Sequence, residues 1–422
     1  MAALLDSLAA LAAEVADSRW PRVREWREAA LAQAVRVGLP HNRLERWRHA
    51  PLRPLAAKRF GAETAAAGIE AAALPPAPRL VLVNGRYSAQ HSDVSALPGL
   101  QVRSLAEALQ GEDERALAVL GRTFPDIDAP FAALNTALAE DGLLIEAPAD
   151  AVFDTPLHLV LLQTPDARGA QTLRHKIECR DNSRLQVIEH HLGAGQALGN
   201  QLWHVHLKPG SRLTHVRLQD LGPAHTGIHR CDTVVAGDAE YIRLDVDAGG
   251  HYLRHELNIA LQGRGARACA GGVLWGEGGG NLDTRLEIRH QAPDTTCELP
   301  WRGLADGKAR VSFYGGITID AGADGSDAAL SNKNLLLGPQ AQVNTQPALE
   351  IYADEVKAAH GATVGQLDAA ALFYLRSRGV PEREAVAMLT RAFYAEALAV
   401  LDEDLRETVR PYLPARLRAE EA

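Results

Sequence analysis

The spacing of apolar residues changes twice along the chain and divides the sequence into three regions. In the first and last regions apolar residues recur every three or four positions, the period of one helix face. In the middle region short runs of Val, Ile and Leu alternate with Gly or Pro, which is typical of strands joined by turns. We therefore expect a mainly helical region over 1–142, a β region over 143–365 and a helical domain over 366–422.

The N-terminal region is predicted to contain several helices and one strand. Leu4, Leu8 and Leu11 share a helix face, and Pro21 opens a second helix that ends at Gly38. The segment 62–78 is rich in Ala and Pro and is expected to be a linker. Later elements are predicted over Arg79–Val83 (a strand), Ser104–Leu109 (a helix) and Ala129–Leu138 (a helix).

The middle region is predicted to be built from short strands. Glycines punctuate it every 12 to 15 residues between Gly195 and Gly278, which indicates even strand spacing. A barrel, a sandwich and a solenoid all fit this pattern. A solenoid would pair its strands without exposed ladders, but no strict sequence repeat favours it over a sandwich. The expected strands include Leu157–Leu162, Leu185–Glu189, Leu202–Leu207, Leu213–Leu218, Tyr241–Val246, Leu253–Leu261 and Thr284–Ile288.

The C-terminal region is predicted to form three helices. Asp368 is the expected N-cap of a helix over Ala369–Arg378, which Gly379 ends. Pro381 begins the second helix, and Asp402 caps the third. The order along the chain is therefore helical cap, β body and helical cap.

Composition narrows the class of protein. The 422 residues carry 44 Lys and Arg against 53 Asp and Glu, a formal net charge of −9, which argues against a nucleic-acid partner. No apolar stretch reaches the length of a membrane helix, and the first residues lack the basic start of a signal peptide. We expect a cytoplasmic chain with no membrane association. The four cysteines form no CxxC pair and are interpreted as packing residues: Cys179, Cys231, Cys269 and Cys297.

Sixteen histidines raise the question of a metal site. His204 and His206 share a face of a predicted strand, as in the first half of a cupin motif, but no Glu follows within Leu207–Leu213. We therefore interpret these histidines as solvated or structurally hydrogen-bonded. A protein that binds metal through its histidines is retained as an alternative function.

Motifs for enzymatic chemistry are absent from the sequence. The segment His360–Gly365 resembles a phosphate loop, but Gln366 stands where a Lys would be required. No GxSxG nucleophile elbow is present. A β-helix carbohydrate-active enzyme is the remaining enzymatic alternative, although aromatic residues make up only 5% of the chain. We expect a protein that is not an enzyme.

The segment Pro347–Val364 combines a histidine with carboxylates. If one strand runs through it unbroken, Glu350, Tyr352, Asp354 and His360 share a face. A neutral imidazole beside carboxylates can bind iron or zinc, or carry protons. A surface histidine at a strand end is the simpler interpretation.

Several segments in fixed order are distinctive in the C-terminal part of the chain and near its start. They are Ser331–Gly338, Pro347–Lys357, His360–Gly365, Leu372–Gly379 and the N-terminal Gly38–Pro40 with Glu45 and Trp47. These segments closely resemble the SufB/SufD family of iron–sulfur cluster assembly proteins. The resemblance is dense over about 331–395 and weaker but collinear elsewhere. The chain is short for a SufB and lacks cysteine-bearing insertions, which favours the SufD branch of the family.

The resemblance implies a fold, partners and cargo. The fold would be mainly β with α caps, a right-handed parallel β-helix flanked by N-terminal and C-terminal helical domains. The chain would be a non-catalytic scaffold that pairs with SufB through the β-helices and holds the ATPase SufC with its C-terminal helices. An isolated chain would hold no cofactor, and the iron–sulfur cluster would be transient in the SufBCD complex. The sequence does not decide the cluster type, the iron donor or whether the complex binds FAD.

The resemblance also implies the site residues. His360 matches the family histidine at the SufB interface and is expected to ligate, or to orient ligands for, a nascent cluster shared with SufB. Glu355 is a second candidate there. Family members often carry a cysteine two residues before this histidine, but here that position is Ala358, so SufB must supply any thiolate. Isolated chains are expected to pair with one another through the same surface. The residues expected to contact SufC are Phe373, Tyr374, Arg376 and Arg378.

Overall fold

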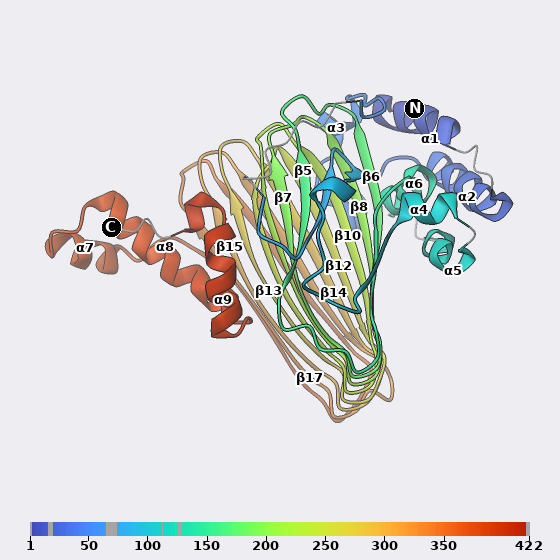
Figure 1. The fold of residues 1–422 in the computed structure, drawn as a ribbon. Helices are drawn as coiled ribbons and strands as arrows, with labels where there is room; N and C mark the ends of the chain where they lie inside the picture. Colours follow the sequence, from blue (N-terminus) through green and yellow to red (C-terminus); the bar gives the residue numbers. More distant parts are fainter. Residues whose placement is uncertain are drawn as a thin grey trace.

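The computed structural model describes residues 2–15, 20–64, 74–111, 113–122, 124 and 129–418. Its body is a parallel β-helix of two facing sheets, with helices at both ends of the chain (Figure 1). This confirms the predicted mainly β fold with α caps and excludes the sandwich and the barrel. Part of the expected linker over 62–78, residues 65–73, lies outside the described residues. No described helix has the length and apolar character needed to cross a bilayer.

Each coil of the β-helix contributes one strand to each sheet. Neighbours within a sheet are parallel and in register, apart from short antiparallel strands at the N-terminal end. Sheet A contains β3 (Gln101–Ser104), β4 (Leu143–Ala147), β6 (Ala170–Cys179), β8 (Leu198–Leu207), β10 (Thr226–Val235), β12 (Tyr252–Leu261), β14 (Asn281–His290), β16 (Arg310–Ile319) and β18 (Gln342–Ile351). Sheet B contains β1 (Arg79–Val83), β2 (Arg86–Tyr87), β5 (Leu157–Gln163), β7 (Arg184–Gly193), β9 (Arg212–Leu221), β11 (Glu240–Gly249), β13 (Arg267–Gly276), β15 (Thr296–Ala305), β17 (Asp327–Leu336) and β19 (Lys357–Gly365).

The seven predicted strands all fall inside observed strands, but the segment before His360 differs from the expectation of one unbroken strand. β18 ends at Ile351 in sheet A, a turn follows, and β19 begins at Lys357 in sheet B. The chain must turn because the two walls of the β-helix face each other. Glu350 and His360 therefore belong to different sheets and share no face.

Apolar side chains stack in rows along the interior because the strands are in register. One row of sheet B runs through Leu185, Leu213, Tyr241 and Ala268, all of them buried. These residues belong to a single core cluster that also receives the inward face of sheet A. At roughly 25 cal/mol for each Å² of apolar surface buried, this continuous core is the main stabilising term of the fold.

The helices form two groups on opposite sides of the β-helix (Figure 1). The N-terminal group lies beside sheet A, and the C-terminal group packs on sheet B. The N-terminal helices are α1 (Ala3–Val15), α2 (Pro21–Val37), η1 (Glu45–Trp47), α3 (Arg53–Ala56), η3 (Ala89–His91), α4 (Leu105–Gln110), α5 (Glu114–Leu117), η4 (Ala118–Gly121) and α6 (Pro130–Leu138). The C-terminal helices are α7 (Ala369–Ser377), α8 (Glu382–Leu398), α9 (Glu403–Val409), η5 (Arg410–Tyr412) and η6 (Ala415–Leu417).

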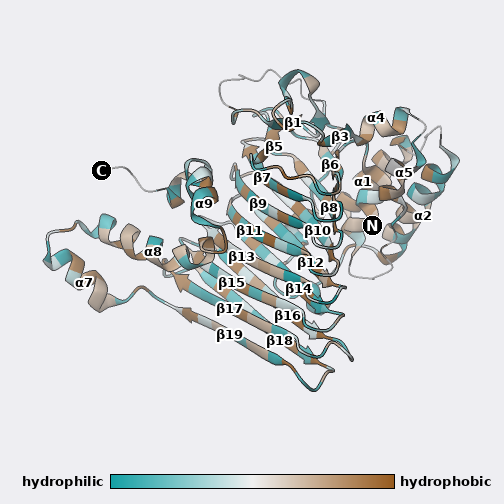
Figure 2. Cartoon of the chain, turned by 60° about the horizontal axis from the view of Figure 1, so that its bottom comes forward, coloured by the Kyte–Doolittle hydropathy of each residue, from teal (hydrophilic) through white to brown (hydrophobic). Residues whose placement is uncertain are grey.

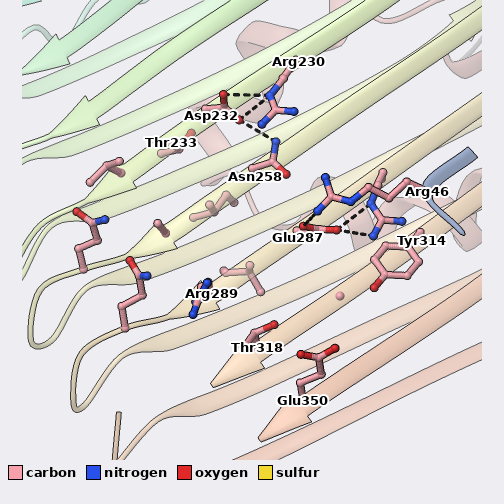
Figure 3. Close-up of a pocket in the computed structure, with 18 of the residues that line it drawn as sticks. Arg46, Arg230, Asp232, Thr233, Asn258, Glu287, Arg289, Tyr314, Thr318 and Glu350 are labelled. Atoms are coloured by element: carbon pink, nitrogen blue, oxygen red, sulfur yellow. Dashed lines mark hydrogen bonds and ion pairs between the residues drawn. The ribbon is translucent and has the colours of Figure 1, made fainter. Parts of the chain in front are cut away.

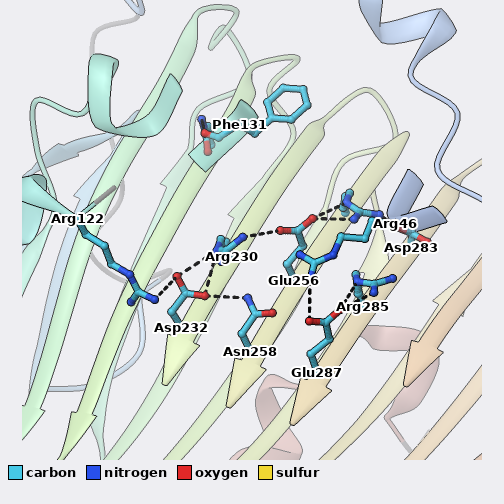
Figure 4. A network of polar contacts seen from close by, with 12 residues as sticks. Arg46, Arg122, Phe131, Arg230, Asp232, Glu256, Asn258, Asp283, Arg285 and Glu287 are labelled. Carbon is cyan, nitrogen blue, oxygen red and sulfur yellow. Dashed lines mark hydrogen bonds and ion pairs between the residues drawn. The ribbon is translucent and has the colours of Figure 1, made fainter. Parts of the chain in front are cut away.

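An ionic network on the outer face of sheet A fastens the N-terminal group (Figure 4). Arg254 is buried and hydrogen-bonded to Glu256 and Asp283, and its guanidinium lies 3.9 Å from the Trp47 ring centroid. Burial by itself would raise the pKa of Glu256, but the attraction of Arg254 and Arg230 lowers it to about 2. These pairs are shielded from water, so each member depends on its partners.

Polar side chains also occupy part of the interior. The carboxylate of Glu189 accepts a hydrogen bond from Trp203 Nε1 at 3.1 Å and lies 2.6 Å from a ring nitrogen of His191 and 3.0 Å from one of His215. Burial would raise the pKa of Glu189, but the two histidines hold it well below its usual range. His225 is buried as well, and within the described residues neither of its ring nitrogens has a hydrogen-bond partner.

Burial makes His225 a source of acid sensitivity. It lowers the pKa of His225 from 6.5 to about 3, so below pH 6.5 the unfolded chain binds a proton that the folded chain does not. The free energy of unfolding therefore decreases as the pH falls from 6.5 towards 3. We expect His225→Asn to reduce the pH slope of the unfolding free energy by up to about 1.4 kcal/mol per pH unit below pH 6.5. Urea unfolding across this range measures the slope, and the exposed His41→Asn is the control. An unchanged slope in the His225 variant would contradict this account.

The ionic network gives a second expectation. Arg254→Met leaves Asp283 without its hydrogen-bonded cation and leaves Glu256 paired with Arg230, and it should cost about 3–5 kcal/mol of unfolding free energy. Arg264→Met is the matched control, because its ion pair with Asp294 is exposed and should contribute at most about 1 kcal/mol. Chemical denaturation of both variants makes the comparison. Equal losses would show that the network does not fasten the N-terminal group.

Candidate functional site

The two ends of the β-helix are finished differently. At the N-terminal end the short antiparallel strands β2 and β3 close the two sheets. At the other end, among the strands that the structure describes, β18 pairs only with β16, and β19 pairs only with β17 (Figure 2). Strands β18 and β19, here called the open coil, therefore present an unpaired edge of backbone donors and acceptors in both sheets.

The surface of the open coil is exposed and partly apolar. Large apolar side chains on the open coil and directly after β18 are exposed: Ile351 is 42% exposed, Tyr352 63% and Val364 46%. The preceding strands, such as β16, are largely buried. An exposed apolar edge of this kind is typical of a surface that another protein covers.

His360 lies on β19 of the open coil. It is in register with Leu330, a buried core residue of β17, which itself aligns with Leu299 on β15. Residues in register share a face, so His360 continues an inward-facing row beyond the last paired strand. The imidazole is exposed because no further coil stacks on it. It is thus placed to meet whatever covers this end.

Glu355 lies in the turn before β19, where its carbonyl oxygen accepts a hydrogen bond from the Gly325 backbone at 2.7 Å. From Lys357 to His360 alone the strand rises about 10 Å. The structure therefore does not bring the Glu355 carboxylate and the His360 imidazole together on one ion. Within the described part of the chain, no group of three His, Cys, Asp or Glu side chains has the geometry of a metal site.

The four cysteines lie away from the open coil and are poor thiolates. Three are buried, and Cys269 is half-buried on β13. Burial raises the pKa of Cys179 and Cys297 to about 12 and that of Cys231 and Cys269 to about 11. In the absence of a metal these thiols therefore stay protonated at neutral pH, which agrees with their predicted packing role.

Helix α7 carries the predicted partner residues on an exposed surface. Phe373 is 74% exposed and Tyr374 57%, and no residue of α7 is buried. Arg378 lies 5.2 Å from the Tyr374 ring, and Arg376 pairs with Glu382 at 3.3 Å. The four predicted side chains thus occur together around one short helix.

Helices α8 and α9 pack on sheet B, and α8 contacts α7 through the ion pair of Glu382 with Arg376. Tyr394, Ala397 and Leu405 pack in a cluster with the outer face of sheet B, including Leu244. The Tyr394 hydroxyl donates a hydrogen bond of 2.6 Å to the Leu417 carbonyl. The C-terminal domain is therefore anchored by its later helices, while α7 projects from the β-helix (Figure 1).

A polar groove of about 680 Å³ crosses the outer face of sheet A, from Arg122 to Glu350 (Figure 3). Asp232 accepts hydrogen bonds from Arg230 and Asn258, and Glu287 pairs with Arg46 at 2.9 Å. The charges on its walls thus largely neutralise one another. The groove reaches the open coil through Glu350 on β18.

The sequence interpretation missed this groove, although a signal for it exists. An arginine followed two positions later by a carboxylate recurs on neighbouring strands of sheet A, and each such pair is hydrogen-bonded. Side chains two apart on a strand share a face, so the repeat marks a charged stripe. Its members are Arg230 with Asp232 on β10, Arg254 with Glu256 on β12 and Arg285 with Glu287 on β14.

His204 and His206 occupy the same strand, as predicted. The two ring nitrogens of His204 lie 3.0 Å from Arg122 and 2.9 Å from Arg174. Both contacts of the His204 ring are made by arginine guanidinium groups, and neither is made by a carboxylate that could share a metal ion with it. Burial, with the nearby arginines, lowers the pKa of His204 well below its usual range.

Comparisons with known proteins identify the family. The model described as "SUF system FeS cluster assembly, SufBD core domain" matches residues 161–393, and the "SufBD protein N-terminal region" matches residues 4–159. The chain is 30% identical over 398 residues to the iron–sulfur cluster assembly protein SufD of Escherichia coli. The matched region covers 92% of this chain and 91% of that protein. It is 29% identical over 383 residues to a SufBD family protein of Synechocystis, covering 85% and 83% of the two chains. The chain therefore belongs to the SufBD family and has a role in iron–sulfur cluster assembly.

Proposed function

We propose that this chain is a non-catalytic scaffold subunit that pairs with SufB through the open coil and holds the ATPase SufC through α7. The observation that carries the proposal is the unpaired end of the β-helix, which exposes His360 in a member of a cluster-assembly family. The chain offers one imidazole there and no thiolate, so its part in assembly is to complete a site rather than to form one alone.

Pairing through the open coil follows from the hydrogen-bonding needs of the edge. β18 and β19 are ten and nine residues long, so a partner with coils of similar width would continue both sheets. Such a partner would also cover Ile351, Tyr352 and Val364. A SufB subunit meets this description if it shares the family fold. Without it, a second copy of this chain would be the nearest substitute, as a homodimer.

His360 would lie at this joint. Its inward-facing row ends at the last coil, so its imidazole would face the first coil of the partner. Cluster iron prefers thiolates, and with Ala358 in place of a cysteine those ligands would come from SufB. Because Glu355 is separated from His360, the imidazole would be the principal ligand or orienting group from this chain.

Replacing His360 tests this role. We expect His360→Ala to leave the free energy of unfolding and complex assembly unchanged, because the side chain is exposed. Cluster accumulation in the complex should fall, measured by iron and sulfide content and by visible absorbance. The exposed His41→Ala is the control and should accumulate clusters normally. Wild-type cluster content in the His360 variant would remove this residue from the site.

Binding of SufC is supported by the exposed ring pair on α7. Phe373 and Tyr374 present apolar surface on a helix that contributes nothing to the core, so their exposure is unexplained within the chain. Aromatic residues flanked by arginines are the composition of binding hot spots. Arg376 and Arg378 would then contact acidic groups on the ATPase.

The double variant Phe373→Ala with Tyr374→Ala tests this surface. We expect it to weaken SufC binding by at least about tenfold, while the melting temperature is unchanged, because neither ring is buried. Calorimetric titration with purified SufC measures the affinity. Val152→Ala, an exposed apolar side chain on another part of the molecule, is the control. Unaltered affinity in the double variant would place the SufC contact elsewhere.

A further inference from the structure

A second, smaller pocket lies where the strands of sheet A begin, between those strands and α3. Its volume is about 220 Å³, below the roughly 300–1,000 Å³ of pockets for drug-sized ligands, so it suits a small ligand. Its lining includes three cations, Lys58, Lys308 and Arg310, and no carboxylate. This contrasts with the groove of Figure 3, where arginines and carboxylates neutralise one another.

The three cations are not neutralised by neighbouring residues. Among the described residues none of them forms an ion pair; Arg310 instead donates a hydrogen bond to the Gln342 side chain at 3.0 Å. The acidic residues of the two adjoining turns, Glu277 and Asp306, are not part of the lining. Glu277 pairs with Arg416 at 2.6 Å, and Asp306 accepts a hydrogen bond from the Gly307 backbone at 2.7 Å. Three uncompensated cations in a chain with a net charge of −9 indicate an anionic ligand.

The floor of the pocket contains an unsatisfied amide. Asn281 is in register with Tyr252 on one side and Arg310 on the other, so it lies one strand spacing, about 4.8 Å, from each. Both polar atoms of its side chain are buried, and neither has a hydrogen-bond partner in the described part of the chain. Buried amides without partners are rare, because the lost hydrogen bonds are costly. The Asn281 amide therefore calls for a ligand that both accepts and donates.

The turn before Asn281 leaves room for that ligand. It consists of Gly278, Gly279 and Gly280, and a Cβ added to Gly279 would meet no atom within 4 Å. Tyr252 forms the wall beside α3, and its hydroxyl donates a hydrogen bond of 3.3 Å to the Ala50 carbonyl, which holds the N-terminal segment against the pocket. The cavity is therefore formed by two elements that are fixed to each other.

We propose that this pocket binds a protonated oxyanion of the phosphate class. The ligand oxygens accept hydrogen bonds from the three cations and from the Asn281 amide nitrogen, and a P–OH group donates to the Asn281 amide oxygen. Inorganic phosphate keeps at least one such proton at neutral pH, whereas sulfate keeps none. The pocket contains neither His360 nor any residue of α7, and it touches the open coil only through the contact of Arg310 with Gln342, so the proposal goes beyond the scaffold role.

Titration of the full chain with inorganic phosphate at neutral pH tests the proposal, with binding followed by calorimetry. We expect one saturable site with an affinity in the millimolar range or tighter, and sulfate at least about tenfold weaker. AMP tests the role of the proton, because the phosphoryl group of a phosphate monoester has lost most of its last proton at neutral pH, its pKa being about 6. Weaker binding of AMP than of inorganic phosphate supports a site for a protonated free oxyanion, and equal or tighter binding would overturn the P–OH contact with Asn281.

Two variants localise the site. Asn281→Asp preserves the shape but places a carboxylate on the floor, and should abolish phosphate binding. Lys308→Gln alters an exposed side chain and should weaken binding about tenfold without a change in melting temperature. Lys208→Gln removes the same charge from a different turn and is the control. No saturable binding to the wild-type chain, or wild-type affinity in Lys308→Gln, would overturn the proposal even if the Asn281→Asp variant failed to fold.

Discussion

Backbone hydrogen bonding between coils is the constraint on which this structure depends. Every strand in the body of the β-helix satisfies its backbone donors and acceptors through the coils on either side. The first and last strands have only one neighbouring coil, so their outer edges need another hydrogen-bonding partner. At the N-terminal end the chain supplies this partner itself, because the short antiparallel strands β2 and β3 pair with the first strands of the two sheets. At the other end, β18 and β19 each have one edge that pairs with no other strand of the described residues. This asymmetry leaves an exposed edge at one end of the molecule, where we propose that the partner binds.

The same register that builds the core also positions His360. Inward-facing rows run from coil to coil, and the row through Leu299 and Leu330 passes from buried apolar residues to an exposed imidazole at the last strand. The change of residue type coincides with the loss of a covering coil. A histidine in that position is held by the rigid scaffold beneath it while its ring remains available to a second chain.

Local signals in the sequence correctly predicted the residues at which two C-terminal helices begin. Asp368 and Asp402 were expected as N-caps, and the side chain of each accepts backbone hydrogen bonds at the start of its helix. The strands were harder, because several are interrupted by glycine. Gly272 in β13 is an example: a Cβ there would lie 2.2 Å from the Trp301 ring on the next coil. The reason for that glycine is a contact between coils, which no local pattern reveals.

The candidate site was likewise predicted only in part from the sequence. Periodicity alone placed Glu350 and His360 on one face, and the structure separates them because the chain turns between the two sheets. His360 itself was identified by family resemblance, since an exposed histidine at a strand end carries no distinctive pattern. The charged groove and the small cationic pocket were missed, because their residues come from strands about 30 positions apart and meet only through the register of the coils.

Hydrogen–deuterium exchange over residues 342–365 tests the central claim most directly. The isolated chain, diluted until it is monomeric, is compared with the chain bound to SufB. The account predicts that the edge amides of β18 and β19 exchange rapidly in the monomer and become strongly protected in the complex, while β8 and β10 are unchanged. A stable complex in which exchange over 342–365 stays as fast as in the monomer would contradict pairing through the open coil.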